Sequence, residues 1–496
     1  MGHKIDTKLT REPIAIIGIG CRFPGADDLQ SFWRILRDGI ETVCEYPGGR
    51  FDRVDRFYAA QSEGQPGTAV RRGGFLKNLD LFDADFFGIS PREAILLDPQ
   101  HRLLLELGWE ALEDAGLPLG SVAGSRTGAF VGQWTSDFET CINEAATDPH
   151  LYLTTGSGRY AAAGRLAYHF DLRGPTLTLD TACSSSLVAV HLACQSLRTG
   201  ESDLVLAGAV NLILRPEITQ AYDSAGMLSP DGRCKFGDVS ADGYVRSEGA
   251  GVLALKLLGR AIADGDPIHA IIRGSAITND GSSSALLVSP SREGQAATIR
   301  AALRDAGISA AELDYIEAHG TGTAAGDPVE LEAIGSVLAE AHRDRPCFVG
   351  SAKTNVGHAE SAAGMIGLCK SILSLKHASI PASLHFREPN PNIPWNKLPL
   401  AISGEQRPWP HDRERRIASV NSVGITGTNA HVVVENPPPV SVKDESPERA
   451  RLFVISARTP AALEQAAASW RVKIADANSH PWPMADLAYT AANRRT

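Results

Sequence analysis

The chain has 496 residues, of which 43% are hydrophobic and 21% are charged, a balance typical of a globular protein rather than a disordered one. Its 48 Lys and Arg residues against 58 Asp and Glu residues give a net charge of −10, which argues against nucleic-acid and anionic-membrane binding. No apolar run approaches the roughly 18 to 20 residues that a membrane span needs. The polar segment 1–12 has no apolar signal-peptide core, so we expect a cytoplasmic protein.

The eight cysteines are scattered, without a CxxC pair or a Cys/His cluster at zinc spacing, so no metal site is expected. In a long chain without an export signal they are interpreted as free thiols in a reducing compartment. Most are expected to be small buried hydrophobic residues, and Cys183 is the exception.

Between residues 13 and 436 the sequence alternates short β-branched runs with helical patterns. The predicted strands are 14–19, 128–131, 176–180, 204–210, 252–258, 269–277, 315–318, 348–352, 417–420 and 430–435. This alternation predicts an α/β domain with largely parallel or mixed buried sheets.

The first predicted strand ends in Gly18-Ile-Gly20, which resembles the start of a dinucleotide-binding motif. The third glycine of that motif would fall at Phe23, so the close-packing residue is missing. We interpret this segment as a buried strand that leaves through a glycine turn, which weakens the case for a nicotinamide dehydrogenase.

A helix is predicted to begin at Asp98-Pro99, with Asp98 as its N-cap, and to end at Gly116. Its apolar positions fall on one face: Leu103, Leu104, Leu107, Ala111 and Leu112.

Cys183 lies in the run DTACSSS (180–186), between a predicted strand and a helical pattern. A thiol at a helix N-terminus faces free N–H groups and the positive end of the helix dipole, which predicts a lowered thiol pKa. The same N–H groups can hold a developing oxyanion. The alternative is a small core cysteine, and the turn alone does not decide between them.

His319 follows a predicted strand and opens the run HGTGT (319–323), where small residues allow a ligand to approach closely. After it, Asp327-Pro328 is predicted to begin a helix, with Glu330 completing a capping box.

His358 ends the run KTNVGH (353–358) and precedes another amphipathic helix. The positive potential of a helix N-terminus predicts a neutral imidazole, which can accept a thiol proton or donate to an enolate. Lys353 alone is most simply a solvated lysine, but beside His358 and Glu360 it can tune the local charge.

The segment 437–451 is rich in proline and charge and is interpreted as a linker. A small α/β element follows over 452–496. It comprises a predicted strand 452–456, a helix that Thr459 caps and Pro460 begins, and a last helix near the end of the sequence.

Three motifs occur in order: DTACSSS (180–186), EAHGTGT (317–323) and KTNVGH (353–358). Together they resemble the β-ketoacyl synthase (ketosynthase) domains of type I polyketide synthases, and their order and spacing make the resemblance very specific. Further similar segments are IIGIGCRFPG (16–25), FFGISPR (86–92), DPQHR (98–102), WEALEDA (109–115) and 424–431. The resemblance covers 13–436, and the tail from 452 resembles part of the linker between a ketosynthase and an acyltransferase domain.

The resemblance implies a thiolase-like α/β fold with two similar halves in five layers (αβαβα), paired as a homodimer. By motif match, Cys183 takes an acyl chain from a phosphopantetheine thiol. His319 and His358 then promote decarboxylation of a malonyl-type extender on an acyl carrier protein. The resulting enolate attacks the Cys183 thioester. Lys353 and Glu360 match the supporting charged pair.

The resemblance also implies that Thr321 and Thr323 contact the pantetheine arm, while Val423 and Ile425 line the substrate pocket. The main-chain N–H groups of Cys183 and Ile425 are the expected oxyanion donors. No cofactor is expected on this chain, because the carrier protein supplies the phosphopantetheine arm. An acyltransferase domain is the expected downstream neighbour.

The sequence departs from the family where the common pattern NSFGFGGTNAH is replaced by NSVGITGTNAH (421–431). Both phenylalanine positions are aliphatic, as Val423 and Ile425, and one glycine is Thr426. We expect a pocket that is altered in shape and gating but still competent.

The sequence is also compatible with two other functions. One is a non-elongating module that holds or passes chains within a megasynthase scaffold, although such members usually lose the cysteine or the first histidine. The other is a thiolase- or hydrolase-like enzyme that acts on free thioesters with the same cysteine chemistry.

Overall fold

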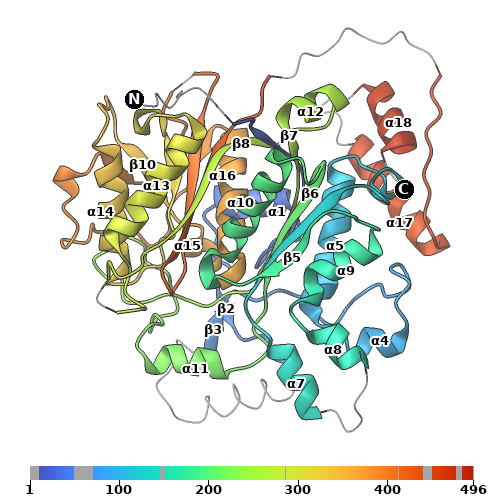
Figure 1. Cartoon of the computed structure of the whole chain (residues 1–496), viewed down its shortest axis with the longest axis horizontal. Helices are drawn as coiled ribbons and strands as arrows, with labels where there is room; N and C mark the ends of the chain where they lie inside the picture. The colour runs from blue at the N-terminus through green and yellow to red at the C-terminus, as the bar shows by residue number, and fades with distance from the viewer. Residues whose placement is uncertain are drawn as a thin grey trace, which may run out of the picture.

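The computed structural model describes residues 11–49, 71–145, 151–284, 286–411, 413–439, 450–475 and 483–494. Most of the predicted extension 1–12 and most of the predicted linker 437–451 therefore lie outside the described residues. An 11-stranded mixed sheet runs through the molecule, with helices on both sides (Figure 1).

The sheet divides into two halves that share one topology. The first half contains β1 (Ile14–Arg22), β4 (Thr127–Gln133), β5 (Thr176–Leu179), β6 (Leu204–Asn211) and β7 (Gly249–Leu257). The second contains β8 (Ala270–Asn279), β9 (Tyr315–Glu317), β10 (Cys347–Gly350), β14 (Ile417–Val423) and β15 (Thr428–Glu435), with β12 (Leu400–Ile402) at its outer edge. β1 and β8 pair antiparallel and join the halves.

From this junction outward, the strands run β1-β7-β6-β4-β5 on one side and β8-β15-β14-β9-β10 on the other. If the five strands of each half are numbered along the chain, the order outward from the junction is the first strand, then the fifth, the fourth, the second and the third. The pairings also match, since two antiparallel pairs are followed by two parallel pairs in each half. The two similar halves implied by the resemblance are therefore present.

The helices complete five layers. α10 (Ser185–Arg198) and α16 (Ala363–Lys376) form the middle layer, where each contacts strands of both halves. α5 (Pro99–Asp114) and α9 (Ala161–His169) cover the outer face of the first half, and α13 (Arg292–Ala306) and α14 (Gly326–Leu338) cover that of the second. The main hydrophobic core surrounds the middle layer, so residues at the start of α10 and α16 are held rigidly.

Shorter elements surround this frame. They are α1 (Leu29–Arg37), β2 (Cys44–Glu45), β3 (Arg72–Gly73), α4 (Pro91–Ile95), α6 (Leu119–Val122), α7 (Asp137–Ala145), α8 (Leu151–Ser157), α11 (Glu217–Ser224), α12 (Leu258–Asp264), α15 (Lys353–Val356), β11 (Ser379–Ile380) and β13 (Arg407–Pro408). Within the described residues, no helix combines the length and the apolar character that crossing a membrane would require.

The predicted glycine turn after the first strand is wrong, because β1 continues through Gly18 and Gly20 to Arg22. The two glycines are needed because α5 crosses β1 at very close range. A Cβ on Gly18 would lie 2.0 Å from the carbonyl oxygen of Ala111, and one on Gly20 would lie 2.3 Å from that of Leu107. These glycines serve backbone packing rather than a turn.

The prediction for α5 is confirmed. Asp98 is its N-cap and accepts a hydrogen bond from the main-chain N–H of Gln100 at 2.8 Å, and Pro99 is the first helical residue. Of the predicted apolar face, Leu103 is half-buried and four residues are fully buried: Leu104, Leu107, Ala111 and Leu112.

The predicted strand 452–456 is not a strand. Leu452 is 80% exposed and Val454 39% exposed, and this segment pairs with no strand in the part of the chain that the structure describes. A β-branched run without a neighbouring strand has no hydrogen-bonding ladder to stabilise it. The helix predicted after it is present as α17 (Pro460–Ala475), and Thr459 Oγ1 accepts from the N–H of Ala462 at 3.2 Å.

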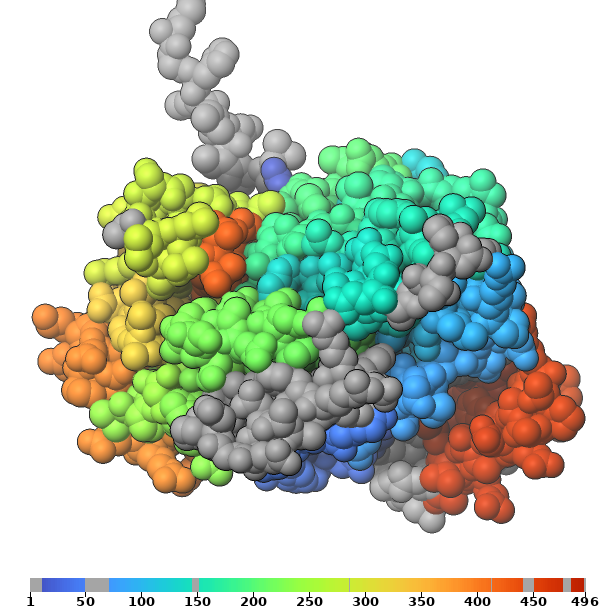
Figure 2. Space-filling model, turned by 90° about the horizontal axis from the view of Figure 1, so that it is seen from below, coloured from blue at the N-terminus to red at the C-terminus, as the bar shows by residue number. Residues whose placement is uncertain are grey.

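α17 and α18 (Met484–Asn493) lie at the end of the molecule beside the first half, opposite α13 and α14 (Figures 1 and 2). Two arginines attach this C-terminal region to the first half: Arg458 donates to the carbonyl of Phe86, and Arg494 donates to that of Gly116 at 3.1 Å. Ala488 and Ala491 are the buried residues of α18. The C-terminal helices therefore lie beside the first half, although they follow β15 of the second half in the sequence.

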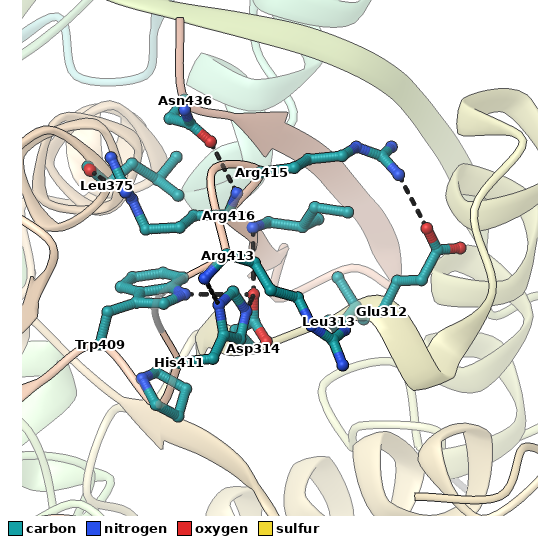
Figure 3. Close-up of polar contacts among 12 residues, drawn as sticks. Glu312, Leu313, Asp314, Leu375, Trp409, His411, Arg413, Arg415, Arg416 and Asn436 are labelled. Atoms are coloured by element: carbon teal, nitrogen blue, oxygen red, sulfur yellow. Dashed lines mark hydrogen bonds and ion pairs between the residues drawn. The ribbon is translucent and has the colours of Figure 1, made fainter.

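Asp314, just before β9, fixes the segment that leads into β14 (Figure 3). Its Oδ2 accepts from Trp409 Nε1 at 3.2 Å, from His411 Nε2 at 3.0 Å and from the main-chain N–H of Ile417 at 3.3 Å. Its side chain is only 5% exposed, and the guanidinium of Arg345 lies 3.4 Å away. One buried carboxylate thus holds three donors from separate points of the segment.

Candidate active site

Two equivalent turns lead into the middle layer. In the first half, β5 passes through a 3₁₀ turn (Ala182–Ser184) into α10, and in the second, β10 and α15 lead through a 3₁₀ turn (Glu360–Ala362) into α16. The two 3₁₀ turns contact each other. Each begins at a residue in the left-handed region, Ala182 with φ 54° and Glu360 with φ 47°. Such strain in a non-glycine residue is characteristic of functional turns.

A cavity of about 380 Å³ opens beside these turns. Its lining includes seven of the residues that the sequence predicts for the site: Cys183, His319, His358, Thr321, Thr323, Val423 and Ile425. Glu360 also lines the cavity, whereas Lys353 is buried behind it. These eight lining residues come from four separate segments of the chain, at 183, 319–323, 358–360 and 423–425.

Cys183 lies at the predicted strand-to-helix turn and is partly exposed. The expected lowering of its pKa is wrong, since burial and the charge of Glu360 raise the pKa of the thiol to about 12. The ammonium of Lys353 and the main-chain N–H of Cys183 itself act in the opposite direction and are outweighed. The thiol is therefore protonated at neutral pH, because desolvation opposes the charged form more strongly than the helix start favours it.

His319 and His358 face each other, with ring centroids 5.2 Å apart and planes at 85°. The Nδ1 of His358 accepts from the main-chain N–H of Glu360 at 3.1 Å, and the Nδ1 of His319 accepts from that of Val423 at 3.4 Å. In a neutral imidazole, an Nδ1 that accepts leaves the proton on Nε2. Both rings thus present an Nε2–H donor.

Both imidazoles are neutral near pH 7. Burial and the nearby charge of Lys353 lower the pKa of His319 and of His358 well below the usual value. The guanidinium of Arg246 contributes further at His358. The expectation of a neutral imidazole agrees with these shifts, but burial rather than the helix dipole is the largest cause.

Lys353 and Glu360 do not form an ion pair with each other within the described chain. Glu360 instead pairs with Arg246, whose Nε lies 2.6 Å from Oε1 and whose second nitrogen lies 2.9 Å from Oε2. Both side chains are 2% exposed. Lys353 Nζ donates to the main-chain carbonyl of His319, so its ammonium supports the loop that carries this histidine.

The predicted capping box at Asp327 and Glu330 is wrong. α14 begins at Gly326, and its first main-chain N–H donates to Thr323 Oγ1 at 3.1 Å rather than to Asp327. Glu330 is buried and accepts from the main-chain N–H groups of His319 at 2.6 Å and Gly320 at 2.8 Å, and from Asn421 Nδ2 at 2.7 Å. The carboxylate therefore fixes the backbone at His319.

Asp327 has a similar role one turn earlier. It is buried, and its two oxygens accept from the main-chain N–H groups of Gly322 at 3.0 Å and Gly237 at 2.8 Å. Thr321 and Thr323 stand on the loop that these carboxylates hold, with their hydroxyl oxygens 3.2 Å apart. The two buried carboxylates hold this loop on the side away from the cavity, so its cavity side is open to a ligand.

Four residues of the segment 423–427 form a further wall of the cavity: Val423, Gly424, Ile425 and Gly427. The hydroxyl of Ser422 donates to the main-chain carbonyl of Cys183 at 2.8 Å, which ties this wall to the cysteine turn. The main-chain N–H of Ile425 has no acceptor among the described residues. It is therefore free to donate to a ligand in the cavity, as is expected of an oxyanion donor.

Sequence reasoning missed three residues of the site: Arg246, Tyr222 and Tyr244. The two tyrosines line the cavity, and Arg246 lies beneath it. They come from α11 and from the irregular segment before β7, where no periodic pattern or motif marks them. No cluster of three or more metal-binding side chains occurs within the described ranges.

Comparison with known proteins identifies the family of the chain. The chain matches the family models "Beta-ketoacyl synthase, N-terminal domain" over residues 11–261 and "Beta-ketoacyl synthase, C-terminal domain" over 269–387. Residues 389–494 match "Ketoacyl-synthetase C-terminal extension". The chain therefore belongs to the beta-ketoacyl synthase family, and its fold is thiolase-like.

Within this family, the relatives of the chain are polyketide synthases, so the chain is a ketosynthase of the polyketide synthase class. It is 45% identical over 492 residues to one protein of the phenolphthiocerol/phthiocerol polyketide synthase of Mycobacterium tuberculosis, covering 98% of this chain and 26% of that protein. A second protein of the same synthase and organism is 42% identical over 490 residues, covering 98% of this chain and 31% of that protein. The chain thus spans about a quarter to a third of these relatives.

Two solved ketosynthase structures are similar to this chain in fold and in sequence. The ketosynthase from module 6 of the bacillaene synthase of Bacillus subtilis 168 has a TM-score of 0.87 and 36% identity, covering 98% of this chain and 81% of that one. The oxazolomycin ketosynthase domain of Streptomyces albus JA3453 has a TM-score of 0.89 and 34% identity, covering 97% and 83%.

Proposed function

We propose that this chain catalyses a decarboxylative Claisen condensation between an acyl group on Cys183 and a malonyl-type extender on an acyl carrier protein. The supporting observation is the cavity itself, in which one thiol and two neutral imidazoles with Nε2–H donors converge. Thioester exchange needs a nucleophilic sulfur beside oxyanion donors, and decarboxylation needs donors for an enolate oxygen. The cavity supplies both sets of groups.

The first step is acylation. Cys183 Sγ attacks the carbonyl carbon of an acyl thioester, and the main-chain N–H groups of Cys183 and Ile425 donate to the oxygen that gains charge. The S–C bond to the pantetheine thiol then breaks. Because both imidazoles already carry a proton on Nε2, the proton from Cys183 passes to the departing thiolate.

The second step is condensation. The C–C bond to the malonyl carboxylate breaks, CO₂ leaves, and the electron pair moves into an enolate whose oxygen accepts from the Nε2–H groups of His319 and His358. The enolate carbon attacks the Cys183 thioester and forms the new C–C bond. The Cys183–acyl bond breaks, and the sulfur takes up one proton, which restores the thiol.

The partner of this reaction is an acyl carrier protein. In this proposal its phosphopantetheine arm enters along Thr321 and Thr323, which both line the cavity, and the chain itself holds no cofactor. An acyltransferase is the proposed source of the loaded extender. We also propose a cytoplasmic location, supported by cysteines such as Cys183, Cys194 and Cys369 that occur as free thiols.

We further propose that two copies form a homodimer through β5. This strand is the last of the sheet, paired to β4 on one side only, and its Leu177 is 52% exposed. An open edge with an exposed apolar side chain is suited to pairing with the same edge of a second copy. Leu177→Glu is expected to shift the sedimentation of the protein from dimer to monomer.

The condensation is tested by adding malonyl-loaded carrier protein to acylated enzyme and following the carrier by intact mass. The proposal predicts loss of CO₂ and a β-ketoacyl product on the carrier. Acylation without extension would favour the chain-passing alternative. Extension from malonyl thioesters that are free of a carrier, at the same rate, would favour the thiolase-like alternative.

A further inference from the structure

Two tyrosines form one wall of the cavity. Tyr222 lies on α11 and Tyr244 lies in the segment before β7, and both line the cavity together with Cys183. Their rings are 6.1 Å apart, centroid to centroid, with planes at 62°. The two tyrosine side chains therefore lie next to each other in the lining of the cavity.

The rings are held in place from behind. Tyr222 stacks on Trp134, with centroids 6.3 Å apart and planes at 17°, and the guanidinium of Arg246 lies 5.8 Å from its centroid. Arg246 is itself fixed by the buried ion pair with Glu360. The ring of Tyr244 packs edge-on against His358 at 5.3 Å. Packing of this kind sets the direction of each hydroxyl.

Neither hydroxyl has a hydrogen-bond partner among the residues that the structure describes, although Tyr244 is only 6% exposed. Neither hydroxyl is among the fully buried side-chain atoms that lack a partner, so both are open to the cavity, where a tyrosine hydroxyl normally finds a partner. Burial and the charge of Glu360 raise the pKa of both phenols, so each hydroxyl keeps its proton and can donate. The cavity thus contains two hydrogen-bond donors that await an acceptor.

We propose that Tyr222 and Tyr244 select acyl chains that carry an oxygen atom close to the thioester, such as 3-hydroxyacyl or 3-oxoacyl groups. This inference rests on the proposed condensation at Cys183. Both tyrosines line the same cavity as Cys183, and the ring of Tyr244 lies against His358, so the oxygen they bind belongs to the first few carbons of the chain. A site built to bond an oxygen rejects a chain that lacks one, because its donors then stay unpaired.

The test measures single-turnover acylation with N-acetylcysteamine thioesters of butyrate, 3-hydroxybutyrate and 3-oxobutyrate. The wild type is expected to react with at least one oxygenated chain about tenfold faster than with butyrate. Tyr222→Phe and Tyr244→Phe keep the rings but remove the hydroxyls, and each is expected to reduce that ratio several-fold. Tyr168→Phe is the matched control, because Tyr168 is 82% exposed, and it should keep the wild-type ratio.

A wild-type ratio near one, or a ratio that both cavity variants leave unchanged, would overturn this inference while leaving the condensation intact. Absence of an adduct from all three thioesters would overturn the proposed function, and the inference with it. The ratio is measured within each variant, so a general loss of activity does not imitate a loss of selectivity.

Discussion

Ala182 and Glu360 occupy equivalent positions in the two halves of the protein, and both hold φ in the left-handed region, at 54° and 47°. Each opens the 3₁₀ turn that leads into a helix of the middle layer. Fold duplication thus brings two strained turns face to face, one ahead of Cys183 and one just after His358. The site is built at the junction of the two halves.

The strain at Ala182 yields the first prediction. Ala182→Gly should leave the free energy of unfolding nearly unchanged, since glycine adopts this φ without a steric penalty. Ala182→Val should lower it by about 1 to 2 kcal/mol and slow acylation, because a β-branched residue tolerates this region poorly. Urea unfolding measures the free energy of unfolding, and a single-turnover assay measures the rate of acylation. Ala467→Val, at an exposed position of α17, is the control, and an equal loss there would contradict the role of backbone strain.

Glu330 gives a second prediction, because its carboxylate holds the main chain of His319. Glu330→Ala should slow malonyl decarboxylation about tenfold or more, whereas acylation of Cys183 should change less. Glu332→Ala is the matched control on the same helix, since the side chain of Glu332 is 31% exposed and pairs with Arg292. An equal loss in both half-reactions would mean that Glu330 supports the whole fold rather than the position of His319.

The pKa shifts give a third prediction, with different pH profiles for the two half-reactions. Because the pKa of Cys183 is raised to about 12, the thiolate fraction grows with pH, and acylation should accelerate from pH 7 to pH 10 without a plateau. The pKa values of His319 and His358 are lowered, so the neutral donors persist as pH falls. Decarboxylation should therefore stay flat between pH 8 and pH 6.

Stopped single-turnover assays at a series of pH values separate these two half-reactions. A plateau of acylation near pH 7 would indicate a low thiol pKa, in conflict with the raised pKa of Cys183. A fall of decarboxylation by half between pH 7 and pH 6 would indicate that an imidazole titrates at its ordinary value.

The sequence pointed to residues that line the cavity, but it did not predict how the carboxylates behind them are used. Asp98 caps α5 as expected, because an N-cap depends on a few adjacent residues. Asp327 and Glu330 follow the capping pattern equally well, yet both carboxylates turn inward to main-chain N–H groups of distant loops. Local sequence cannot show that a competing set of donors lies nearby in the fold.

Two further errors have the same origin. The glycines at Gly18 and Gly20 suggested a turn, but the deciding fact is that α5 crosses β1 without room for a Cβ. The helix start at Cys183 suggested a low pKa, but burial and Glu360 outweigh it. Both depend on packing between segments that are far apart in the chain, and no periodic pattern reports such packing.

Asp314 gives a fourth prediction, on stability (Figure 3). Asp314→Ala should lower the free energy of unfolding by about 2 to 4 kcal/mol, because it leaves the donors of Trp409, His411 and Ile417 buried and unpaired. Asp344→Ala is the control, since the side chain of Asp344 is 94% exposed. Equal unfolding midpoints for the two variants in urea would show that the Asp314 contacts contribute little.

The proposed condensation requires that Cys183 carries the acyl chain, and the decisive measurement is intact mass after incubation with an acyl thioester. We expect one acyl group per chain in the wild type, the same adduct in Cys44→Ala, whose cysteine is exposed, and none in Cys183→Ala. An adduct that persists in folded Cys183→Ala, or a folded wild type that no thioester acylates, would contradict it.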